Sequence, residues 1–380
     1  MKMSQTLPIN KAPHFAYSQY QAAVAAGSTL RARELAKELN ITEGDLVACR
    51  QDIDAWRLRA PFHLLLAELK NVGDVMTITR NDQAVHETTG IYHSFQFDEE
   101  RKTGLVLSKD IDLRLFIGQW HCAFYLLENG RHSLQFFNQH GVAVHKVYRT
   151  EASNHDEWQR LVEAFKDTNP ELPTFIQARP QTTPTELPEG FDQAAFAADW
   201  ARLNDVHEYH GMLKKHGLSR TQALAQIGSH WATSLTSDSL AHALTQAEAK
   251  NAEIMVFVGN AGAIQIYSGG VHKLLIQGPW FNVLDPKFNL HLRVDQIAEA
   301  WVIERPSRDG LITSIEAFNA NGDSIVTLFG KRKPGQPELP LWREIVSAVK
   351  ESHSLKSSHF IEKRPHAQQS KQRQETSNAL

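Results

Sequence analysis

The sequence of 380 residues lacks several features that define specialised classes of protein. It has only two cysteines, Cys49 and Cys122, which excludes a disulfide framework and a CxxC metal clip and favours a reducing compartment. No window approaches the ~20 apolar residues of a membrane-spanning helix. The first residues, MKMSQTLPINKAPHFAYS, lack the continuous apolar segment of a secretory signal. These absences predict a cytoplasmic protein that is not stably inserted in a membrane.

The sequence also lacks a strong excess of charge of one sign. Its 40 basic and 43 acidic residues give a net charge of −3, so we expect no basic surface for a nucleic-acid partner. Hydrophobic residues make up 42% and charged residues 22%, which is ordinary for a globular protein. Nineteen histidines are the one unusual count, and they raise the question of what the imidazoles do.

Two stretches far apart in the chain share a register, which indicates an internal repeat. The run MTITRNDQAVHETTG from Met76 aligns with MVFVGNAGAIQIYSG from Met255, and Asn81 aligns with Asn260, each 179 residues apart. The alignment continues with small shifts, at 177 for Ala123/Ala300, 181 for Phe137/Phe318 and 184 for Trp158/Trp342. The chain is therefore predicted to hold two copies of one unit.

Proline marks the boundary between the two copies. The segment TNPELPTFIQARPQTTPTELPEG holds five of the fifteen prolines, which is typical of an extended linker. The C-terminal residues are rich in Lys, Gln, Ser and His and are predicted to be disordered. The expected organisation is a first repeat at 1–167, a linker at 168–190, a second repeat at 191–352 and a disordered polar tail at 353–380.

Within each copy, helical patterns come first and strand patterns follow. Residues 30–50 and 192–228 have helical periodicity, and Thr42 and Ser219 are suited to cap a helix in each. Short runs rich in Val, Ile, Phe and Thr then predict a meander of strands, and DEWQRLVEAFK and LWREIVSAVK predict a closing helix for each copy. The predicted fold is α+β, with two tandem repeats that each form a large antiparallel sheet flanked by helices.

No hydrolase elbow, P-loop, HExxH or GxGxxG motif occurs in a suitable context, so histidines and differences between the copies are the remaining signals. The segment AAFAADWARLNDVHEYHGMLKKHG predicts one helix whose apolar stripe runs through Phe196, Trp200, Leu203, His207 and His210. A histidine in such a stripe is most often a core residue. The alternative is an axial ligand of an iron already held by a porphyrin, which needs only one imidazole and a flat apolar pocket.

Several arginines are further candidates. Arg114 and Phe116 share one face of the predicted strand DIDLRLFI, either toward solvent or toward a ligand. Arg220 at a helix start, Arg305 in ERPSRDG and Arg332 in FGKRKPG lie in the second copy, where each is either a surface charge or part of a site for carboxylates.

Five segments closely resemble the cytoplasmic hemin-utilisation proteins of Gram-negative bacteria, the HemS/ChuS/HmuS family. They are TRNDQAVHE, DVHEYHGMLKKH, VFVGNAGAIQIYSGGVHKL, GPWFNVLDPKFNLHLR and LFGKRKPGQPELPLWRE, and the resemblance covers residues ~15–350. It implies two tandem sheet-and-helix repeats with haem b bound in the C-terminal half, as ligand or as substrate.

The resemblance also implies roles for individual residues. His207 would be the proximal ligand of the haem iron, with His210 as an alternative and His86 serving a second, weaker site in the first copy. Arg114 would reach the distal side from the first domain, with Phe116 packing on the ring, so that closure across the linker orders the site. Phe257 would line the pocket, and the haem propionates would face Arg220, Arg305 and Arg332. Phe329 stands where some relatives have a tyrosine.

The implied function is haem binding in bacterial haem uptake and iron acquisition, with oxidative opening of the porphyrin and release of iron. The alternative is a carrier that delivers haem to a separate haem oxygenase. No flavin or nicotinamide fingerprint occurs, so an enzyme of this kind would need an external electron donor such as an NAD(P)H-dependent reductase. The partners implied are haem, an inner-membrane haem transporter, a haem oxygenase or a reductase.

Overall fold

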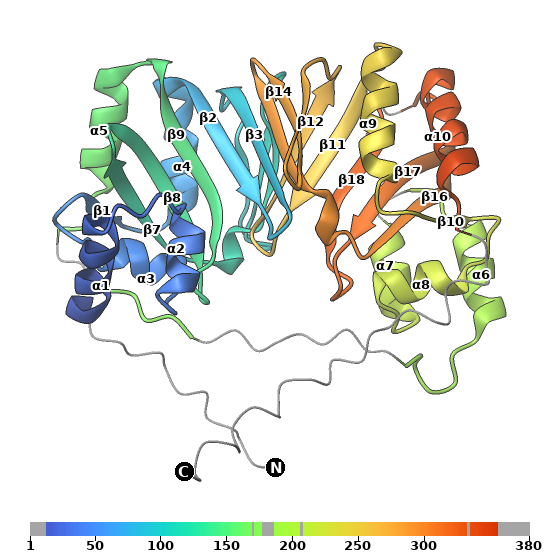
Figure 1. Ribbon diagram of the computed structural model, residues 1–380, viewed down its shortest axis with the longest axis horizontal. Coiled ribbons are helices and arrows are strands. Elements are labelled where there is room, and N and C mark those ends of the chain that lie inside the picture. Colours follow the sequence, from blue (N-terminus) through green and yellow to red (C-terminus); the bar gives the residue numbers. More distant parts are fainter. Residues whose placement is uncertain (1–12, 169–170, 177–185, 206–207, 333–334, 356–380) are drawn as a thin grey trace, which may run out of the picture.

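The computed structural model describes residues 13–168, 171–176, 186–205, 208–332 and 335–355. The candidate ligand His207 and nearly all of the predicted tail lie outside the described residues. Two nine-stranded antiparallel sheets form the centre of the molecule, and helices cover parts of their faces (Figure 1). The α+β architecture with two large antiparallel sheets is therefore confirmed.

The first sheet contains six strands of the first copy and three of the second. Its order is β1 (Ala55–Leu58), β7 (Trp120–Glu128), β8 (Arg131–Asn138), β9 (Ala143–Ser153), β2 (Gly73–Arg80), β3 (Ala84–Ile91), β15 (Phe288–Arg293), β14 (Trp280–Asp285) and β13 (Leu274–Gln277).

The second sheet has the reciprocal composition. Its order is β10 (Ala232–Leu235), β16 (Glu299–Ser307), β17 (Gly310–Phe318), β18 (Ser324–Gly330), β11 (Ile254–Gly259), β12 (Ala263–Gly269), β6 (Asp112–Leu115), β5 (Thr103–Leu107) and β4 (Gln96–Asp98).

The two copies thus exchange three strands, which the sequence did not predict. The exchange occurs where β15 pairs with β3 and where β6 pairs with β12. Hydrogen bonding between strands leaves each strand two usable edges, and the alternation of side chains does not say which chain segment will use the second edge. Each copy therefore completes the sheet of the other, and the two halves cannot be separate folding units joined only by a linker.

Ten α-helices and two short 3₁₀ helices are formed by the described residues. On one face of the first sheet lie α4 (Phe62–Val72) and α5 (His155–Phe165), and on the corresponding face of the second lie α9 (Ser239–Ala249) and α10 (Pro340–His353). The opposite faces are covered at one end by α1 (Pro13–Ala25), α2 (Ala32–Glu38) and α3 (Glu43–Ala48), and by α6 (Gln193–Ala201), α7 (Glu208–Lys215) and α8 (Arg220–Gln226). The 3₁₀ helices are η1 (Ile117–Gln119) and η2 (Val294–Gln296).

The predicted helix caps are confirmed. The side chain of Thr42 accepts a hydrogen bond from the amide of Asp45 at the start of α3, and Ser219 does the same for Gln222 at the start of α8. In both cases the third helical residue bonds back to the cap, which forms a capping box. The two copies therefore begin their last N-terminal helix by the same local chemistry.

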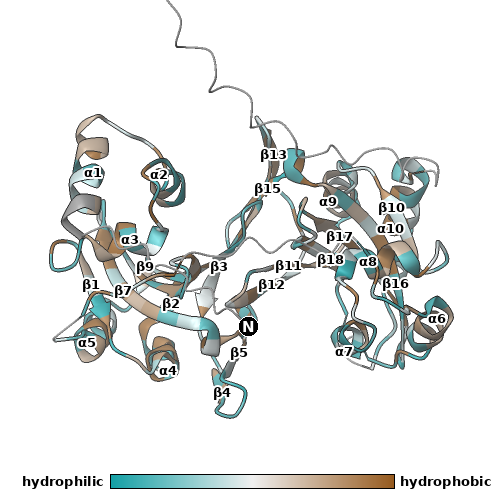
Figure 2. Ribbon diagram, turned by 90° about the horizontal axis from the view of Figure 1, so that it is seen from below, coloured by the Kyte–Doolittle hydropathy of each residue, from teal (hydrophilic) through white to brown (hydrophobic). Residues whose placement is uncertain are grey.

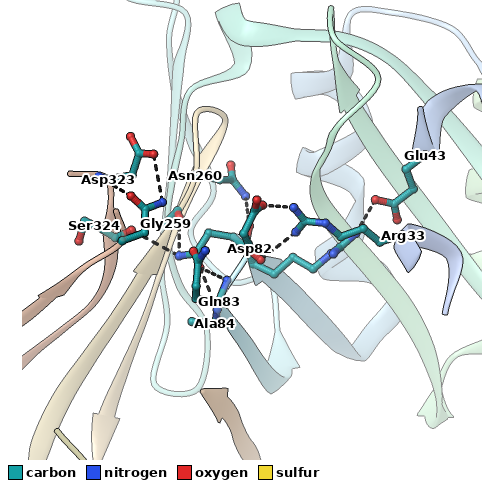
Figure 3. A network of polar contacts seen from close by, with 12 residues as sticks. Arg33, Glu43, Asp82, Gln83, Ala84, Gly259, Asn260, Asp323 and Ser324 are labelled. Carbon is teal, nitrogen blue, oxygen red and sulfur yellow. Dashed lines mark hydrogen bonds and ion pairs between the residues drawn. The ribbon is translucent and has the colours of Figure 1, made fainter. Parts of the chain in front are cut away.

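The aligned residues Asn81 and Asn260 fasten the two sheets together (Figure 3). The amide of Asn81 donates to the carbonyl oxygens of Ile325 at 2.8 Å and Gly259 at 3.2 Å. The amide of Asn260 donates to the carbonyl oxygens of Arg80 at 2.8 Å and Val144 at 2.9 Å. Each side-chain oxygen also accepts two amides of its own turn, so the repeat signature seen in the sequence is a pair of reciprocal junctions between the halves.

The predicted linker contributes to a core in the described part of its length. Phe175 is buried against α3 and β7, where it meets Val47 and Cys122. The predicted boundaries at 167, 190 and 352 stay predictions. No helix among the described residues is both long enough and apolar enough to cross a membrane.

Candidate functional site

The outer face of the second sheet is only partly covered. Trp301, Ile303 and Phe318 of β16 and β17 pack beneath α6, α7 and α8, while α9 and α10 cover the inner face (Figure 2). On the neighbouring strands, Phe257 and Phe329 point to the same outer face but stay half-buried. An open apolar surface therefore continues the sheet beyond the helices.

Strand register defines the extent of this surface. Glu316 of β17 stands opposite Thr327, and Thr327 stands opposite Phe257; Ile266 and Asp112 complete the row on β12 and β6. Residues that face each other across antiparallel strands share a face of the sheet. Four strand spacings separate β17 from β6, which is about 19 Å.

The apolar middle of this surface, which we call the floor, consists of half-buried or buried side chains. Phe257 and Phe329 pack edge to face, with ring centroids 5.3 Å apart. The remaining members of the floor are Met255, Ile264 and Ile266. A flat apolar ligand lying here would be bounded by charged groups at both ends.

Two of the predicted propionate-binding arginines lie together at one end of the floor. The side chain of Glu316 is fully buried, and it binds Arg305 at 2.7 Å and Arg220 at 2.8 Å. Arg305 also donates to the hydroxyl of Ser314 at 3.0 Å. Its guanidinium carbon lies 4.4 Å from the centre of the Tyr209 ring. We call Arg220, Arg305 and Glu316 the arginine cluster.

Electrostatics keep the arginine cluster charged. Burial favours the neutral form of the Glu316 carboxyl, but the guanidinium groups of Arg220 and Arg305 outweigh burial and hold its pKa below the usual range. Burial raises the pKa of the Tyr209 hydroxyl, with the two arginines acting in the opposite direction, so the phenol stays neutral. The cluster therefore carries two positive charges and one negative charge at neutral pH.

Arg332 does not join the arginine cluster. It follows β18 and its nearest acidic partner is Asp309, at 3.7 Å. The three arginines that the resemblance grouped together thus divide into one pair that shares a buried glutamate and one that faces an aspartate.

Arg114 lies at the other end of the floor. It belongs to β6, so the exchange of strands brings this first-copy residue into the second sheet, opposite Ile264. Its guanidinium is ion-paired with Asp112, and Phe116 is half-buried one residue beyond the strand. The sequence predicted that closure across the linker brings Arg114 to the site. The structure shows a different cause, because backbone pairing with β12 already fixes β6 there.

The segment predicted as one helix around His207 is interrupted. Helix α6 ends at Ala201, and α7 begins at Glu208, whose carboxylate accepts the amides of Asn204 at 3.0 Å and Asp205 at 3.4 Å. Asn and Asp favour such turns over helix interiors. The expectation of a continuous helix was wrong here.

The restart of the helix also changes which residues face the core. Phe196, Trp200 and Leu203 are buried as predicted, but Tyr209 is buried after the break and His210 is exposed. His210 therefore points away from the apolar stripe in which the sequence had placed it.

His86 lies far from a ligand surface. It is fully buried between the two sheets, with its ring centroid 5.0 Å from that of Phe288. Burial lowers the pKa of the His86 imidazole to about 3, and neither ring nitrogen has a hydrogen-bond partner among the described residues. In the second copy the aligned residue is Gln265, which donates to Thr88 at 2.7 Å across the same interface.

Comparison of the copies identifies residues that the sequence reasoning missed. At the offsets of the paired strands and caps, Arg220, Arg305 and Glu316 correspond to Glu43, Glu128 and Gln135. Charge is thus reversed at both arginine positions, although the backbone is shared. Glu316 and Tyr209 were not proposed from the sequence, but the difference between Glu316 and Gln135 was a signal that could have found Glu316.

The same comparison bears on His207. At the 177-residue offset of the caps Thr42 and Ser219, Leu30 takes the chain position of His207 in the first copy, and Arg33 takes that of His210. No three His, Cys, Asp or Glu side chains gather as a metal site within the described ranges.

Comparison with known proteins agrees with this arrangement. The family described as the haemin-degrading HemS.ChuX domain matches residues 40–165 and 217–349. The hemin transport protein HemS of Yersinia enterocolitica is 40% identical over 340 residues, which is 88% of this chain and 96% of that protein.

Two solved structures are similar over nearly their whole length. The apo form of PhuS, a heme-binding protein from Pseudomonas aeruginosa, is 44% identical with a TM-score of 0.85, covering 89% of this chain and 99% of that one. The heme-degrading enzyme ChuS of Escherichia coli O157:H7 is 34% identical with a TM-score of 0.82, with the same coverage. The family match covers more than half of the chain in two segments, one in each copy, and this chain belongs to the haemin-degrading HemS.ChuX domain family.

Proposed function

We propose that this protein binds haem on the outer face of its second sheet and degrades it with electrons from an external donor. The observation that carries the proposal is the half-buried floor with an excess of positive charge at the arginine cluster and Arg114 at the opposite end. A flat apolar macrocycle with carboxylates matches that distribution. Relatives named for hemin transport, heme binding and heme degradation support the same function.

His207 is the axial ligand in this proposal. An iron already held by a porphyrin needs only one imidazole from the protein. His207 stands two residues before Tyr209, whose ring covers Arg305, so the ligand would come from the segment beside the arginine cluster. The first copy has Leu30 at the aligned position, which supports a single site of this kind in the second copy.

Arg114 and Phe116 serve the opposite end of the site. A guanidinium donates hydrogen bonds but is not deprotonated, so Arg114 can orient an exchangeable group near the iron without itself becoming a ligand. Asp112 holds Arg114 in the free protein and would share it with the ligand. Phe116 adds apolar contact next to the floor.

The chemistry of degradation belongs to haem and its electron donor, and the protein contributes binding, orientation and exclusion of water. We further propose that the donor is an NAD(P)H-dependent reductase and that haem arrives from an inner-membrane transporter into the cytoplasm. A protein that only carried haem to a separate haem oxygenase would need the same floor and ligand but no electron donor.

Titration with hemin, followed by the Soret band, tests the site. His207→Ala should lower the affinity for hemin at least tenfold and shift the Soret maximum, because the axial bond is lost. His210→Ala is the matched control, since His210 is exposed one turn away, and it should bind as the parent does. An unchanged Soret band in His207→Ala, or a loss confined to His210→Ala, would remove His207 as the ligand.

Turnover of the complex tests degradation. The hemin complex is incubated with NADPH and a reductase in the presence of catalase, which removes peroxide that destroys haem without an enzyme. Loss of the Soret band with stoichiometric release of carbon monoxide or a formaldehyde-like one-carbon product would support an enzyme. Stable haem under these conditions, with loss only when catalase is omitted, would establish the carrier instead.

A further inference from the structure

The two arginines of the arginine cluster hold Glu316 in different ways. Arg305 is 3% exposed, and its guanidinium is fixed by Glu316, by Ser314 and by the Tyr209 ring. Arg220 is 36% exposed and has one ionic contact, to Glu316. Its Nε is buried and has no hydrogen-bond partner among the described residues. Arg220 therefore has donors available for a ligand, whereas those of Arg305 are committed beneath Tyr209.

The charges of the arginine cluster do not cancel. Arg220 and Arg305 contribute two positive charges against the one negative charge of Glu316, which leaves an excess of one. An uncompensated charge in a buried setting is costly unless an opposite charge joins it. Arg332 adds no excess, because Asp309 faces it. The cluster is therefore matched to one anionic group.

The fold itself does not require this set of charges. In the first copy the aligned positions are Glu43, Glu128 and Gln135, on the same strands and the same capped helix. Two copies with one backbone but opposite charges indicate that the arrangement in the second copy serves a ligand rather than the core.

We propose that Arg220 receives a single carboxylate of haem, and that Glu316 and Arg305 are positioning residues that hold Arg220 and limit the charge of the site to one. The second carboxylate then stays in solvent. This inference rests on the proposed haem-binding function. It differs from the role expected from the family resemblance, in which Arg305 itself faces a propionate.

The position of Glu316 in the sheet fits this role. Only Thr327 separates Glu316 from Phe257 along the row of paired residues. A ligand lying on the floor would thus bring a carboxylate at its edge to Arg220 without moving Arg305 from beneath Tyr209. The aromatic floor would position the macrocycle, and the cluster would fix its orientation in the plane.

The test uses the full-length protein and three probes: hemin, its monomethyl ester and its dimethyl ester. If one carboxylate is bound, the monoester should bind within about threefold of hemin, while the diester should bind at least about tenfold more weakly, since a hydrogen bond to a charged group contributes that much. Either monoester isomer can present its free carboxylate, because the macrocycle can turn over in the site.

Four variants then separate positioning from contact. Arg220→Gln should abolish the difference between monoester and diester. Arg305→Gln should do the same, because Glu316 then neutralises Arg220, and Arg305→Lys should restore the difference. Glu316→Gln raises the excess charge to two, so hemin should become preferred over the monoester by about tenfold. Arg160→Gln, an exposed arginine of α5, is the control and should leave all ratios unchanged.

Three results would overturn the inference. They are equal binding of all three probes, a monoester as weak as the diester, and an Arg220→Gln protein that keeps the parent's discrimination. The parent and Arg220→Gln suffice if a variant at buried Arg305 fails to fold, because Arg220 is partly exposed. If the parent does not bind hemin at all, the proposed function fails instead, so the two failures are distinguishable.

Discussion

Removal of the Asn260 side chain should destabilise the whole molecule, because this one residue joins the two sheets. Its amide donates to Arg80 and Val144 in the first half, and its oxygen accepts the amides of Gly262 at 2.8 Å and Ala263 at 3.0 Å. A net hydrogen bond contributes about 0.5–1.5 kcal/mol. Four such bonds, partly replaced by water at this half-buried turn, predict a loss of about 2–4 kcal/mol for Asn260→Ala.

A second substitution separates the two functions of the side chain. Asn260→Asp keeps an oxygen that accepts the turn amides but places a second oxygen against the carbonyl groups of Arg80 and Val144. Acceptors facing acceptors repel, so Asn260→Asp should be at least as destabilising as Asn260→Ala. Asn71→Ala is the matched control, since Asn71 makes one exposed bond to Glu68 within α4, and it should change stability by less than about 0.5 kcal/mol.

Urea unfolding measures these differences. Tryptophan fluorescence and far-ultraviolet circular dichroism are recorded on the same samples, and coincident transitions establish a single cooperative unit. The reasoning would be refuted if Asn260→Ala were as stable as the parent, or if Asn260→Asp were clearly more stable than Asn260→Ala. Separate transitions for the two halves in the parent would also contradict a junction of this strength.

Three further predictions concern pH, capping and the floor. Burial lowers the pKa of His86 to about 3 in the folded state, so the unfolded chain binds more protons below its own pKa of about 6.5. Stability should fall by about 2 kcal/mol from this group between pH 7 and pH 5, and unfolding of His86→Leu should show that much less dependence on pH. Ser219→Ala should lower the free energy of unfolding by about 1 kcal/mol in urea titrations, because it removes the cap of α8. Phe257→Ala should weaken hemin binding about tenfold in Soret titrations, because the floor loses an aromatic contact; unchanged affinity would place the ligand elsewhere.

Local chemistry made much of the fold predictable. The caps Thr42 and Ser219 and the closing helices α5 and α10 were foreseen because their signals lie within a few residues of each other. The break between α6 and α7 was missed because apolar spacing continued through it, while the side chain of Glu208 bonded back to the turn. A pattern of period 3.6 reports which residues are apolar, not whether the backbone between them stays helical.

The candidate site was predictable only in its composition. Arg114, Arg220 and Phe257 were all named from the sequence, and the structure places them on one face of the second sheet. Glu316 was not named, although it determines the net charge of the arginine cluster. Its importance depends on which strands lie beside β17, and nothing near Glu316 in the chain reports that.

The sequence by itself determined the duplicated unit, the order of helices and strands, and the reversal of charge between the copies. Each of these is carried by neighbours in the chain or by alignment of one copy with the other. Only the tertiary structure decided that β6 completes the second sheet, which brings Arg114 to the floor, and that Asn81 and Asn260 lock the halves. Pairing of strands is a contact between distant segments, and the alternation of side chains specifies a face but not the partner at the edge.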